Sequence, residues 1–245
     1  MARRPLYRDH AIVLRTWRLG EADRIVSVLG REHGKIRAVA KGVRKTRSRY
    51  GALLEPGGHI ELQLYPGREL DTMTQAATVD HFAGVRGDLQ RFSQAAVMLE
   101  AVENVALDRE PNLPLYQLLL GALRTLESGD RPLLLTGFLL KLLALEGVQP
   151  ALNHCVSCGA TDDLCFFDAR GGGAKCRSCR GGMPLSADGF GLMHLILEGR
   201  VGLALQEPPS RLTRDLQLLL TMAVEAHLNR QLRSAAFLVG MPSAR

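Results

Sequence analysis

The stretch HIELQLY, residues 59–65, alternates apolar and polar side chains from one end to the other. Ile60, Leu62 and Leu64 point to one side of an extended chain, and the residues between them point to the other. This period of two predicts a β-strand with one buried face. The outward side chains of the strand are expected to be those of His59, Glu61 and Gln63.

Neighbouring segments repeat the pattern. KIRAVAK, residues 35–41, turns Ile36, Ala38 and Ala40 inward and its basic residues outward. Further strands are expected at residues 11–17, 24–29 and 69–79, with glycines in the turns between strands. Five short strands within roughly 80 residues predict a small closed or nearly closed β-barrel, and the oligonucleotide-binding OB-fold is the leading candidate.

Beyond Asp80 the hydrophobic period changes to three and four residues, which predicts helices. One helix is expected to start with Asp130 as its N-cap and Pro132 in its first turn, and to end at Gly147. It is apolar on nearly all sides, so it belongs at the centre of a bundle. The other predicted helices span residues 87–108, 113–127, 187–198 and 211–230.

The chain has 245 residues, of which 46% are hydrophobic, so a core can be buried and global disorder is not expected. Its first residues do not show the charged-then-apolar order of a secretion signal. The most apolar stretch, residues 133–145, is too short to cross a bilayer and contains Lys141. We therefore expect a cytoplasmic protein without a membrane contact, in which paired cysteines hold metal more often than they form disulfides.

Four cysteines form two pairs, CVSC at 155–158 and CRSC at 176–179. Seventeen residues separate the pairs, which is within the spacing of four-cysteine zinc sites. Each pair can form a tight turn that presents two thiolates, and four thiolates complete a tetrahedron around one Zn²⁺. Lys175, Arg177 and Arg180 are placed to offset the negative charge of such a site. The predicted ligands are Cys155, Cys158, Cys176 and Cys179.

Alternatives exist for these cysteines. A redox-active pair of the thioredoxin type needs a helix start in a βαβ setting, which this sequence lacks. His154 can in principle replace one cysteine as a ligand. Cys165 lies between the pairs in the apolar stretch LCFF, and we interpret it as a small buried hydrophobe. A closed shell of four thiolates has no open position for substrate, so the metal is expected to be structural.

These patterns predict an α+β multidomain protein. Residues 1–80 form the five-stranded OB-fold barrel, and residues 81–245 form an α-helical domain. A four-cysteine zinc module, with a short hairpin between its cysteine pairs, is inserted into the helical domain at about residues 152–184.

The sequence carries no recognised pattern for catalysis. GREHGK, residues 30–35, has three residues between its glycines where a phosphate-binding loop needs four, and Ile36 stands where a hydroxyl would hold magnesium. The seven histidines are scattered singly, and neither a GxSxG motif nor an acidic cluster for two metal ions is present. We expect a protein without enzymatic turnover.

The net charge of +6 is concentrated at one end of the chain. Residues 1–50 hold fourteen Lys or Arg against four Asp or Glu, whereas the remaining residues have a balance of −4. Such a confined excess predicts a polyanion-binding face more than a merely solvated basic surface. Phosphate contacts of this kind give affinity without base specificity. The residues predicted to contact nucleic-acid phosphates are Lys35, Arg37, Lys41, Arg44, Lys45, Arg47 and Arg49.

Three aromatic residues lie near this basic segment. Tyr7, Trp17 and Tyr50 can stack on bases or can equally belong to the core. Because aromatic residues are only 5% of the chain, charge is expected to outweigh stacking in binding.

Several short sequence motifs between residues 11 and 57 occur together in one order along the chain. They are Gly20-Glu21-x-Asp23, Gly34-Lys35, Ala40-Lys41-Gly42-Val43-Arg44, Ser48 and Leu54-Glu55-Pro56. With them the chain resembles the RecO family of bacterial DNA repair proteins. The resemblance extends over the whole chain through the helical part and its four-cysteine module.

The resemblance implies a recombination mediator associated with the nucleoid. It implies binding to single- and double-stranded DNA, annealing of complementary strands, and loading of RecA, together with RecR, onto DNA coated by single-strand-binding protein. A contact of the helical domain with the C-terminal tail of single-strand-binding protein is also implied. Because some family members lack the full cysteine set, zinc is not expected to be the working part shared by the family.

Two other functions remain open at this point. A zinc enzyme acting on nucleic acid would need an open ligand position, which four matched thiolates do not offer. An RNA-binding OB-fold and zinc adaptor of the transcription or translation machinery fits the charge distribution as well as a DNA-binding protein does, since the phosphates of RNA and DNA are alike.

Overall fold

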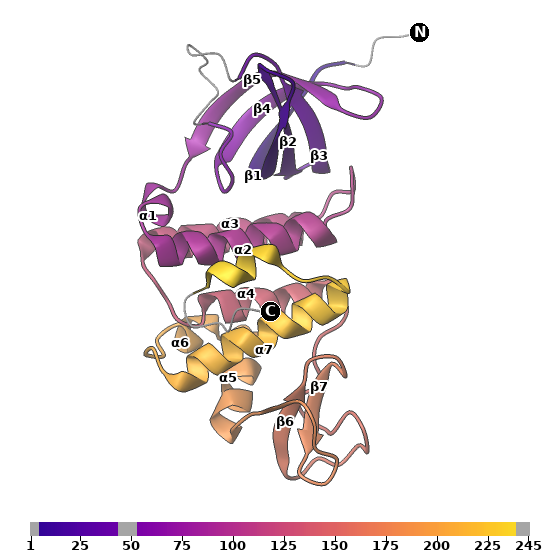
Figure 1. Cartoon of the computed structure of the whole chain (residues 1–245), viewed down its shortest axis with the longest axis vertical. Helices are drawn as coiled ribbons and strands as arrows, with labels where there is room; N and C mark the ends of the chain where they lie inside the picture. The colour runs from indigo at the N-terminus through magenta and orange to yellow at the C-terminus, as the bar shows by residue number, and fades with distance from the viewer. Residues whose placement is uncertain (1–4, 44–52, 239–245) are drawn as a thin grey trace. The chain divides into compact units, whose positions relative to one another are not determined.

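The computed structural model describes residues 5–43 and 53–238. The chain divides into two compact units, Met1–Glu127 and Ser128–Arg245. Figure 1 follows the chain from the strands of the first unit, in indigo and purple, to the helices and the small sheet of the second. Within the described residues, no helix is long and apolar enough to cross a membrane.

Five strands of the first unit close into a barrel in the order β1-β2-β3-β5-β4. All neighbouring strands are antiparallel except β3 and β5, which run parallel. The long strand β1 pairs with both β2 and β4, and a bulge between Val13 and Arg15 bends it. This is the predicted OB-fold. The strands are β1 (Tyr7–Leu19), β2 (Asp23–Gly30), β3 (Gly34–Ala40), β4 (His59–Tyr65) and β5 (Asp71–Asp80).

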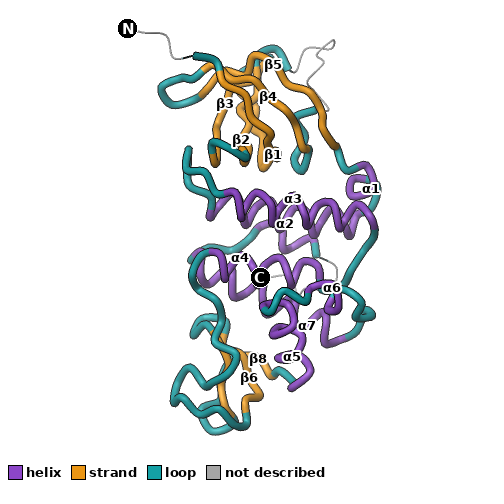
Figure 2. Tube along the Cα trace, turned by 180° about the vertical axis from the view of Figure 1, so that it is seen from behind, coloured by secondary structure: helices purple, strands orange, loops and turns teal. Residues whose placement is uncertain are grey.

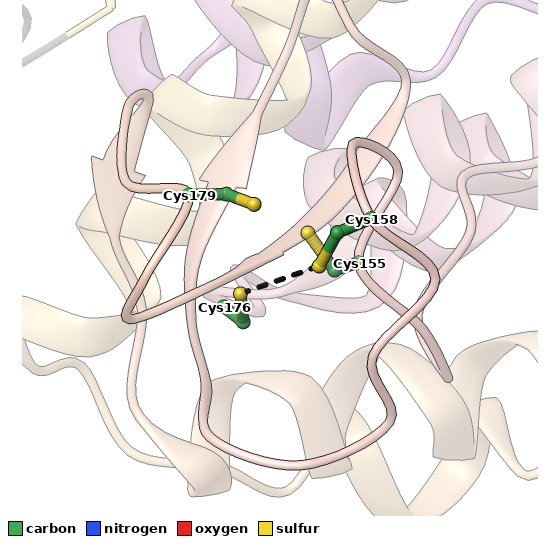
Figure 3. A group of neighbouring side chains, drawn as sticks. All are labelled: Cys155, Cys158, Cys176 and Cys179. Atoms are coloured by element: carbon green, nitrogen blue, oxygen red, sulfur yellow. Dashed lines mark hydrogen bonds between the residues drawn. The ribbon is translucent and has the colours of Figure 1, made fainter.

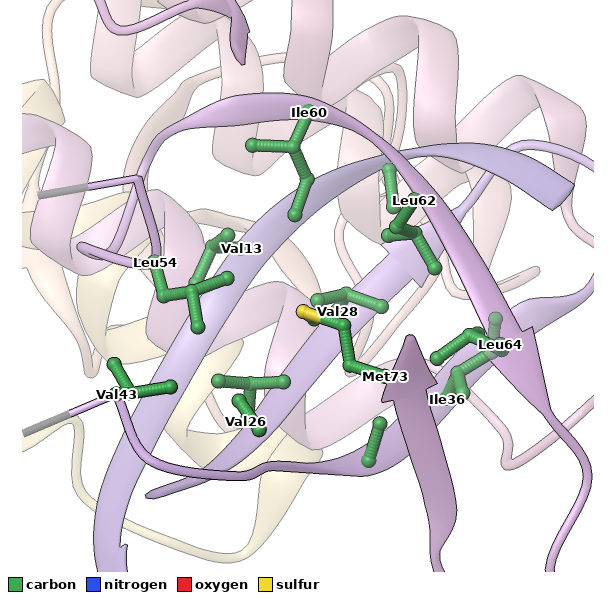
Figure 4. Packing of buried hydrophobic residues seen from close by; sticks show 13 residues of the cluster. Val13, Val26, Val28, Ile36, Val43, Leu54, Ile60, Leu62, Leu64 and Met73 are labelled. Atoms are coloured by element: carbon green, nitrogen blue, oxygen red, sulfur yellow. The ribbon is translucent and has the colours of Figure 1, made fainter. Parts of the chain in front are cut away.

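The barrel core includes the six residues that the alternation placed inward, together with apolar residues that the sequence had not assigned to it. Figure 4 shows Val26, Val28 and Met73 in the middle of this cluster, with Leu54 and Val43 at one end. Ile60, Leu62 and Leu64 of β4 and Ile36, Ala38 and Ala40 of β3 are all buried in it. The period of two thus assigned the correct buried face to both strands.

The helices α1 (Ala83–Arg86), α2 (Leu89–Val105) and α3 (Leu113–Ser128) follow the barrel. Helix α2 packs against β1. His59 points out of the barrel as predicted, yet it is buried. It packs against α3, where its Nε2 lies 2.8 Å from the Tyr116 hydroxyl. The last barrel strand ends at Asp80, where the sequence predicted the change to helices. The first compact unit nevertheless continues through α2 and into α3, up to Glu127.

The segment between α2 and α3 is bonded to the barrel. The backbone N–H of Arg109 donates to the Lys35 oxygen at 2.8 Å, so this segment runs along β3. The Arg109 guanidinium donates at 2.6 Å to Asp71, whose carboxylate is fully buried and also accepts from the Tyr7 hydroxyl and the Gly67 N–H. These bonds fix the two helices to the barrel through both backbone and side chains.

The second unit is built around α4 (Leu134–Leu145), which is buried on nearly all sides as predicted. Its start was predicted wrongly. The N-cap is Leu133, without a side-chain hydrogen bond, so Asp130 and Pro132 precede the helix. Helices α5 (Ala187–Leu197), α6 (Val201–Ala204) and α7 (Arg211–Leu228) and the 3₁₀ helix η1 (Arg233–Phe237) complete the helical part.

A small sheet is inserted between α4 and α5, as Figure 2 shows in orange. Its strands β6 (Leu164–Asp168), β7 (Gly173–Cys176) and β8 (Met183–Pro184) pair in the order β7-β6-β8. Strands β6 and β7 form the hairpin that was predicted between the cysteine pairs. Asp168 stabilises its turn by accepting the N–H groups of Arg170 and Gly171.

Candidate nucleic-acid interface and metal centre

The four predicted cysteine ligands come together in the inserted module. The sulfurs of Cys155, Cys158, Cys176 and Cys179 all lie within 4.8 Å of one another, and the side chains point toward a common centre (Figure 3). The Cys158 and Cys176 sulfurs are 3.7 Å apart. Four sulfurs at 2.3 Å from a tetrahedral zinc would be separated by about 3.8 Å. The cluster therefore has the dimensions of a site for one metal ion.

The two cysteine pairs have the same local geometry. In each turn the backbone oxygen of the first cysteine accepts a hydrogen bond from the backbone N–H four residues later. Gly159 donates to Cys155 in one turn, and Arg180 donates to Cys176 in the other. Gly159 and Arg180 both have a positive φ, which lets each turn close tightly. Both first cysteines are buried, and both second cysteines are exposed. Each turn thus offers one sheltered and one accessible thiolate.

Hydrogen bonds shift the pKa values of the clustered thiols in both directions: those from backbone N–H groups, that of Cys179 first, lower the pKa of Cys176, and those with the other cysteines, Cys158 first, raise the pKa of Cys179. Hydrogen bonds from backbone N–H groups, that of Cys176 first, lower the pKa of Cys155 to about 6. Lys175 forms an ion pair with Asp168 at 2.8 Å, and this pairing, together with the charge of nearby thiolates, raises the pKa of the lysine. Deprotonated sulfurs are the form that binds metal. The donor set therefore fits a soft divalent cation.

Among the residues described, the cluster includes neither His154 nor Cys165. Cys165 lies outside the cluster as predicted, at the irregularity of the β6–β7 ladder, and it is partly buried. His154 is exposed. The predicted set of four cysteines is thus the one that the fold brings together.

Two of the predicted DNA-binding residues are engaged within the protein. The Lys35 ammonium donates to the backbone carbonyl oxygen of Glu103 at 3.0 Å and lies 3.5 Å from the Asp108 carboxylate, and its side chain is only 14% exposed. Arg37, half exposed, pairs with the same Asp108 at 3.0 Å. One carboxylate therefore offsets both cations. Local sequence gave no signal for this, because Asp108 is 71 residues from Arg37.

Lys41 is exposed at the end of β3, where the basic segment begins. The other predicted residues, Arg44, Lys45, Arg47 and Arg49, lie outside the described residues, as does Tyr50. Tyr7 is partly buried against the barrel core, where its hydroxyl donates to Asp71 and its ring centroid lies 4.4 Å from that of His33. Trp17 is partly exposed, with the Arg15 guanidinium 5.0 Å from its ring centroid.

Comparison with known proteins identifies the family. The model of the family "Recombination protein O N terminal" matches residues 1–82, and "Recombination protein O C terminal" matches residues 86–236. The chain is 43% identical over 240 residues to the DNA repair protein RecO of Frankia casuarinae, covering 96% of this chain and 98% of that protein. The chain belongs to the RecO family. DNA repair is accordingly the process in which it takes part.

The structure gives physical reasons for two of the sequence motifs that the first unit shares with the RecO family. The Asp23 carboxylate accepts the Gly42 N–H at 2.8 Å, which joins the β1–β2 turn to the end of β3. Gly34 has a φ of +65°, and a Cβ there would lie 2.1 Å from the Glu110 backbone oxygen. These RecO residues therefore hold the barrel turns and the segment between α2 and α3 in place.

A buried carboxylate that the sequence did not reveal supports the same region. Asp9 is 4% exposed and accepts the N–H groups of Arg31, Glu32 and His33, together with a contact from the His33 ring at 2.9 Å. It thereby closes the β2–β3 turn. Asp9 lies between Arg8 and His10, before the strand expected at residues 11–17, so the local sequence gave no signal for this role.

Proposed function

We propose that this protein is a DNA-binding recombination mediator that anneals complementary single strands and assists RecR in loading RecA onto DNA coated by single-strand-binding protein. It works by binding and juxtaposing strands, without catalytic turnover. The helical domain contacts the C-terminal tail of single-strand-binding protein. Membership of the RecO family supports the general function, and the charge distribution supports the DNA contact.

The observation that carries the proposal is the confinement of positive charge to residues 1–50, at a balance of +10. It peaks where β3 ends and the chain leaves the barrel at Lys41. An OB-fold barrel presents its strands and loops to single-stranded nucleic acid. A dense run of cations at such a position supplies phosphate affinity through counterion release.

Within the predicted set, we assign the phosphate contacts to Lys41, Arg44, Lys45, Arg47 and Arg49. Arg37 lies at the edge of this surface, where DNA must compete with Asp108 for its guanidinium. Lys35 is largely buried against Glu103 and Asp108, so we assign it to stabilising the barrel and α2. The proposed interface is therefore the basic segment after β3, and it is called the basic loop below (residues 41–49).

We propose that the four-cysteine cluster holds one zinc ion with a structural role. Thiolate ligands in a tetrahedral set are typical of zinc, and all four positions are filled by protein. When bound, the ion would cross-link the two turns, since the chain supplies the ligands in two pairs. The cysteines take no part in the proposed DNA contact.

The decisive experiment changes Arg44, Lys45 and Arg47 together to Ala. Each lost phosphate contact lowers the log–log salt slope for single strands by about 0.7, so three contacts lower it by about 2. Annealing should fall in parallel with binding, and the melting temperature should not move. A matched control, Arg170, Arg211 and Arg214 changed to Ala, removes equal charge from exposed sites in the second unit and should bind normally.

Normal binding and annealing by the basic-loop variant would move the DNA site elsewhere. The same oligonucleotides made as RNA separate the proposed mediator from an RNA-binding adaptor, because a clear preference for RNA would favour the latter. Annealing assays with and without cognate single-strand-binding protein test the mediator role itself. Failure to anneal coated strands would contradict that role.

A further inference from the structure

We propose that Trp17, Ile25 and Val39 form a platform on the outer face of the barrel that stacks unpaired nucleobases. These three residues are called the Trp17 row. The proposal rests on the DNA-binding function proposed above and deepens it, since it names unpaired bases, in addition to phosphates, as a ligand. It predicts that the protein distinguishes single strands from duplexes at this site.

The strand register places the three side chains in line. Trp17 of β1 pairs with Ile25 of β2, and Ile25 pairs with Val39 of β3. Directly paired residues in antiparallel strands carry their side chains on the same face of the sheet. That face is the outer one, because the neighbouring residues Val26 and Ala38 point into the barrel core.

The Trp17 row is accessible, whereas the adjacent row is covered. All three of its residues are partly exposed. In the next row the central residue, Ser27, is fully buried and donates to the Glu103 carboxylate of α2 at 2.6 Å. Helix α2 thus shields the barrel surface up to Ser27 and leaves an apolar strip beside it. The strip therefore combines a tryptophan with two branched aliphatic side chains in one row across three strands.

Cationic side chains lie beside the apolar strip, so a ligand that binds there is expected to carry negative charge. Arg15 and Arg37 flank the covered Ser27 in the adjacent row, although Arg37 is paired with Asp108, and Lys41 follows Val39 by two residues. The Arg15 guanidinium lies 5.0 Å from the Trp17 ring centroid, so a planar cation and an aromatic ring already associate there. A ligand that is flat and apolar in one part and anionic in another fits this arrangement. Single-stranded DNA has that character.

Duplex DNA does not meet the same requirements. Its bases are stacked on each other inside the helix, and only its phosphates are available to the cations. Stacking on the Trp17 row therefore adds affinity for single strands alone. It would also hold bases unstacked near Lys41, where a complementary strand can approach.

Trp17 is the only tryptophan of the chain, so its fluorescence reports on this site directly. Oligo(dT) should quench the emission of the full-length protein, and a duplex of equal phosphate number should leave it nearly unchanged. Trp17→Ala should weaken single-strand binding about tenfold while duplex binding stays within about twofold. Trp17→Phe keeps an aromatic face and should restore most of the affinity. Phe92→Ala, at an aromatic residue that is 48% exposed on α2, serves as the control and should bind like the wild type.

The outcomes separate this inference from the function on which it rests. Wild-type protein that binds no DNA would overturn the proposed function. Normal DNA binding with no change in emission, or normal single-strand affinity of Trp17→Ala, would overturn the Trp17 row alone. An equal loss for single strands and duplexes would also overturn it, because such a loss would show a general effect on the barrel. Melting temperatures of the variants identify that case.

Discussion

The carboxylate of Asp23 accepts the backbone N–H of Gly42 at 2.8 Å, across 19 residues of chain. Asp23 opens β2, and Gly42, with a φ of +67°, lies two residues after Ala40, the last residue of β3. The bond therefore fixes the direction in which the chain leaves the barrel for the basic loop. An acidic side chain in the most basic part of the protein has a structural purpose here, and its charge opposes DNA.

This gives opposite expectations for two substitutions of Asp23. Asp23→Asn keeps an acceptor for Gly42 and removes a negative charge, so DNA affinity should stay constant or rise. Asp23→Ala removes the charge and the acceptor, and affinity should fall several-fold because the start of the basic loop is released. Fluorescence anisotropy with single strands measures both. Higher affinity for both variants would show that the carboxylate acts only through its charge.

The metal centre predicts a defined stoichiometry. Elemental analysis should find about one zinc per chain. Replacing Cys176 and Cys179 with Ser should abolish metal binding and lower the melting temperature. Cys165→Ser is the matched control and should leave the metal content unchanged, because Cys165 lies outside the cluster. Stable wild-type protein that contained no metal would contradict the proposed site.

A charged substitution in the buried part of α4 should destabilise the protein and should not act by removing a binding surface. Leu139 is fully buried, so Leu139→Asp places an unpaired carboxylate in the core of the second unit and should cost about 4 kcal/mol or more. Leu145→Asp on the same helix, at a residue that is 44% exposed, should be tolerated. Urea unfolding followed by circular dichroism compares the two. A soluble and stable Leu139→Asp protein would mean that the residue is not core.

The Asp71 network predicts acid sensitivity of the first unit. Burial raises the pKa of Asp71, but hydrogen bonds from Arg109, Tyr7 and the Gly67 N–H outweigh burial and hold the pKa below its usual value. The charged form is therefore favoured by folding. Its contribution is complete at neutral pH and is lost as the pH falls from about 4 through the lowered pKa.

Asp71→Asn tests this contribution. The variant should be less stable at pH 7 by about 2 kcal/mol or more, because the buried ion pair with Arg109 is broken. The difference from the wild type should shrink as the pH falls below 4. Melting temperatures measured across this range decide the matter, and a difference that is independent of pH would exclude a role for the charge.

Local patterns predicted the barrel well because each strand carries its own evidence. HIELQLY occupies β4 from His59 to Tyr65, and the cysteine spacing led directly to the four sulfurs that cluster. Both depend on residues close in sequence. The start of α4 was mispredicted at Asp130 because a good capping residue was available but tertiary packing placed the first turn at Leu134.

Relationships between distant residues could not be predicted in this way. The burial of His59 depends on Tyr116, and the neutralisation of Lys35 and Arg37 depends on Asp108. In each case the sequence indicated correctly that the side chain leaves the barrel, but not what it meets there. Outward-facing residues of a barrel covered by helices need the tertiary structure for their interpretation.

The chain enters and leaves the four-cysteine module at its sheet. Ala151 bridges to Gly173 of β7 on one edge, and β8 ends at Pro184 on the other. Three inter-strand spacings separate these edges, about 14 Å, which a linker of about five residues can span. A gene could therefore lose the whole module, cysteines and metal together, and still encode α4 joined to α5. The module can therefore be lost during evolution without disrupting the helices on either side. Two relatives of which only one has the metal site can then share the same function on DNA.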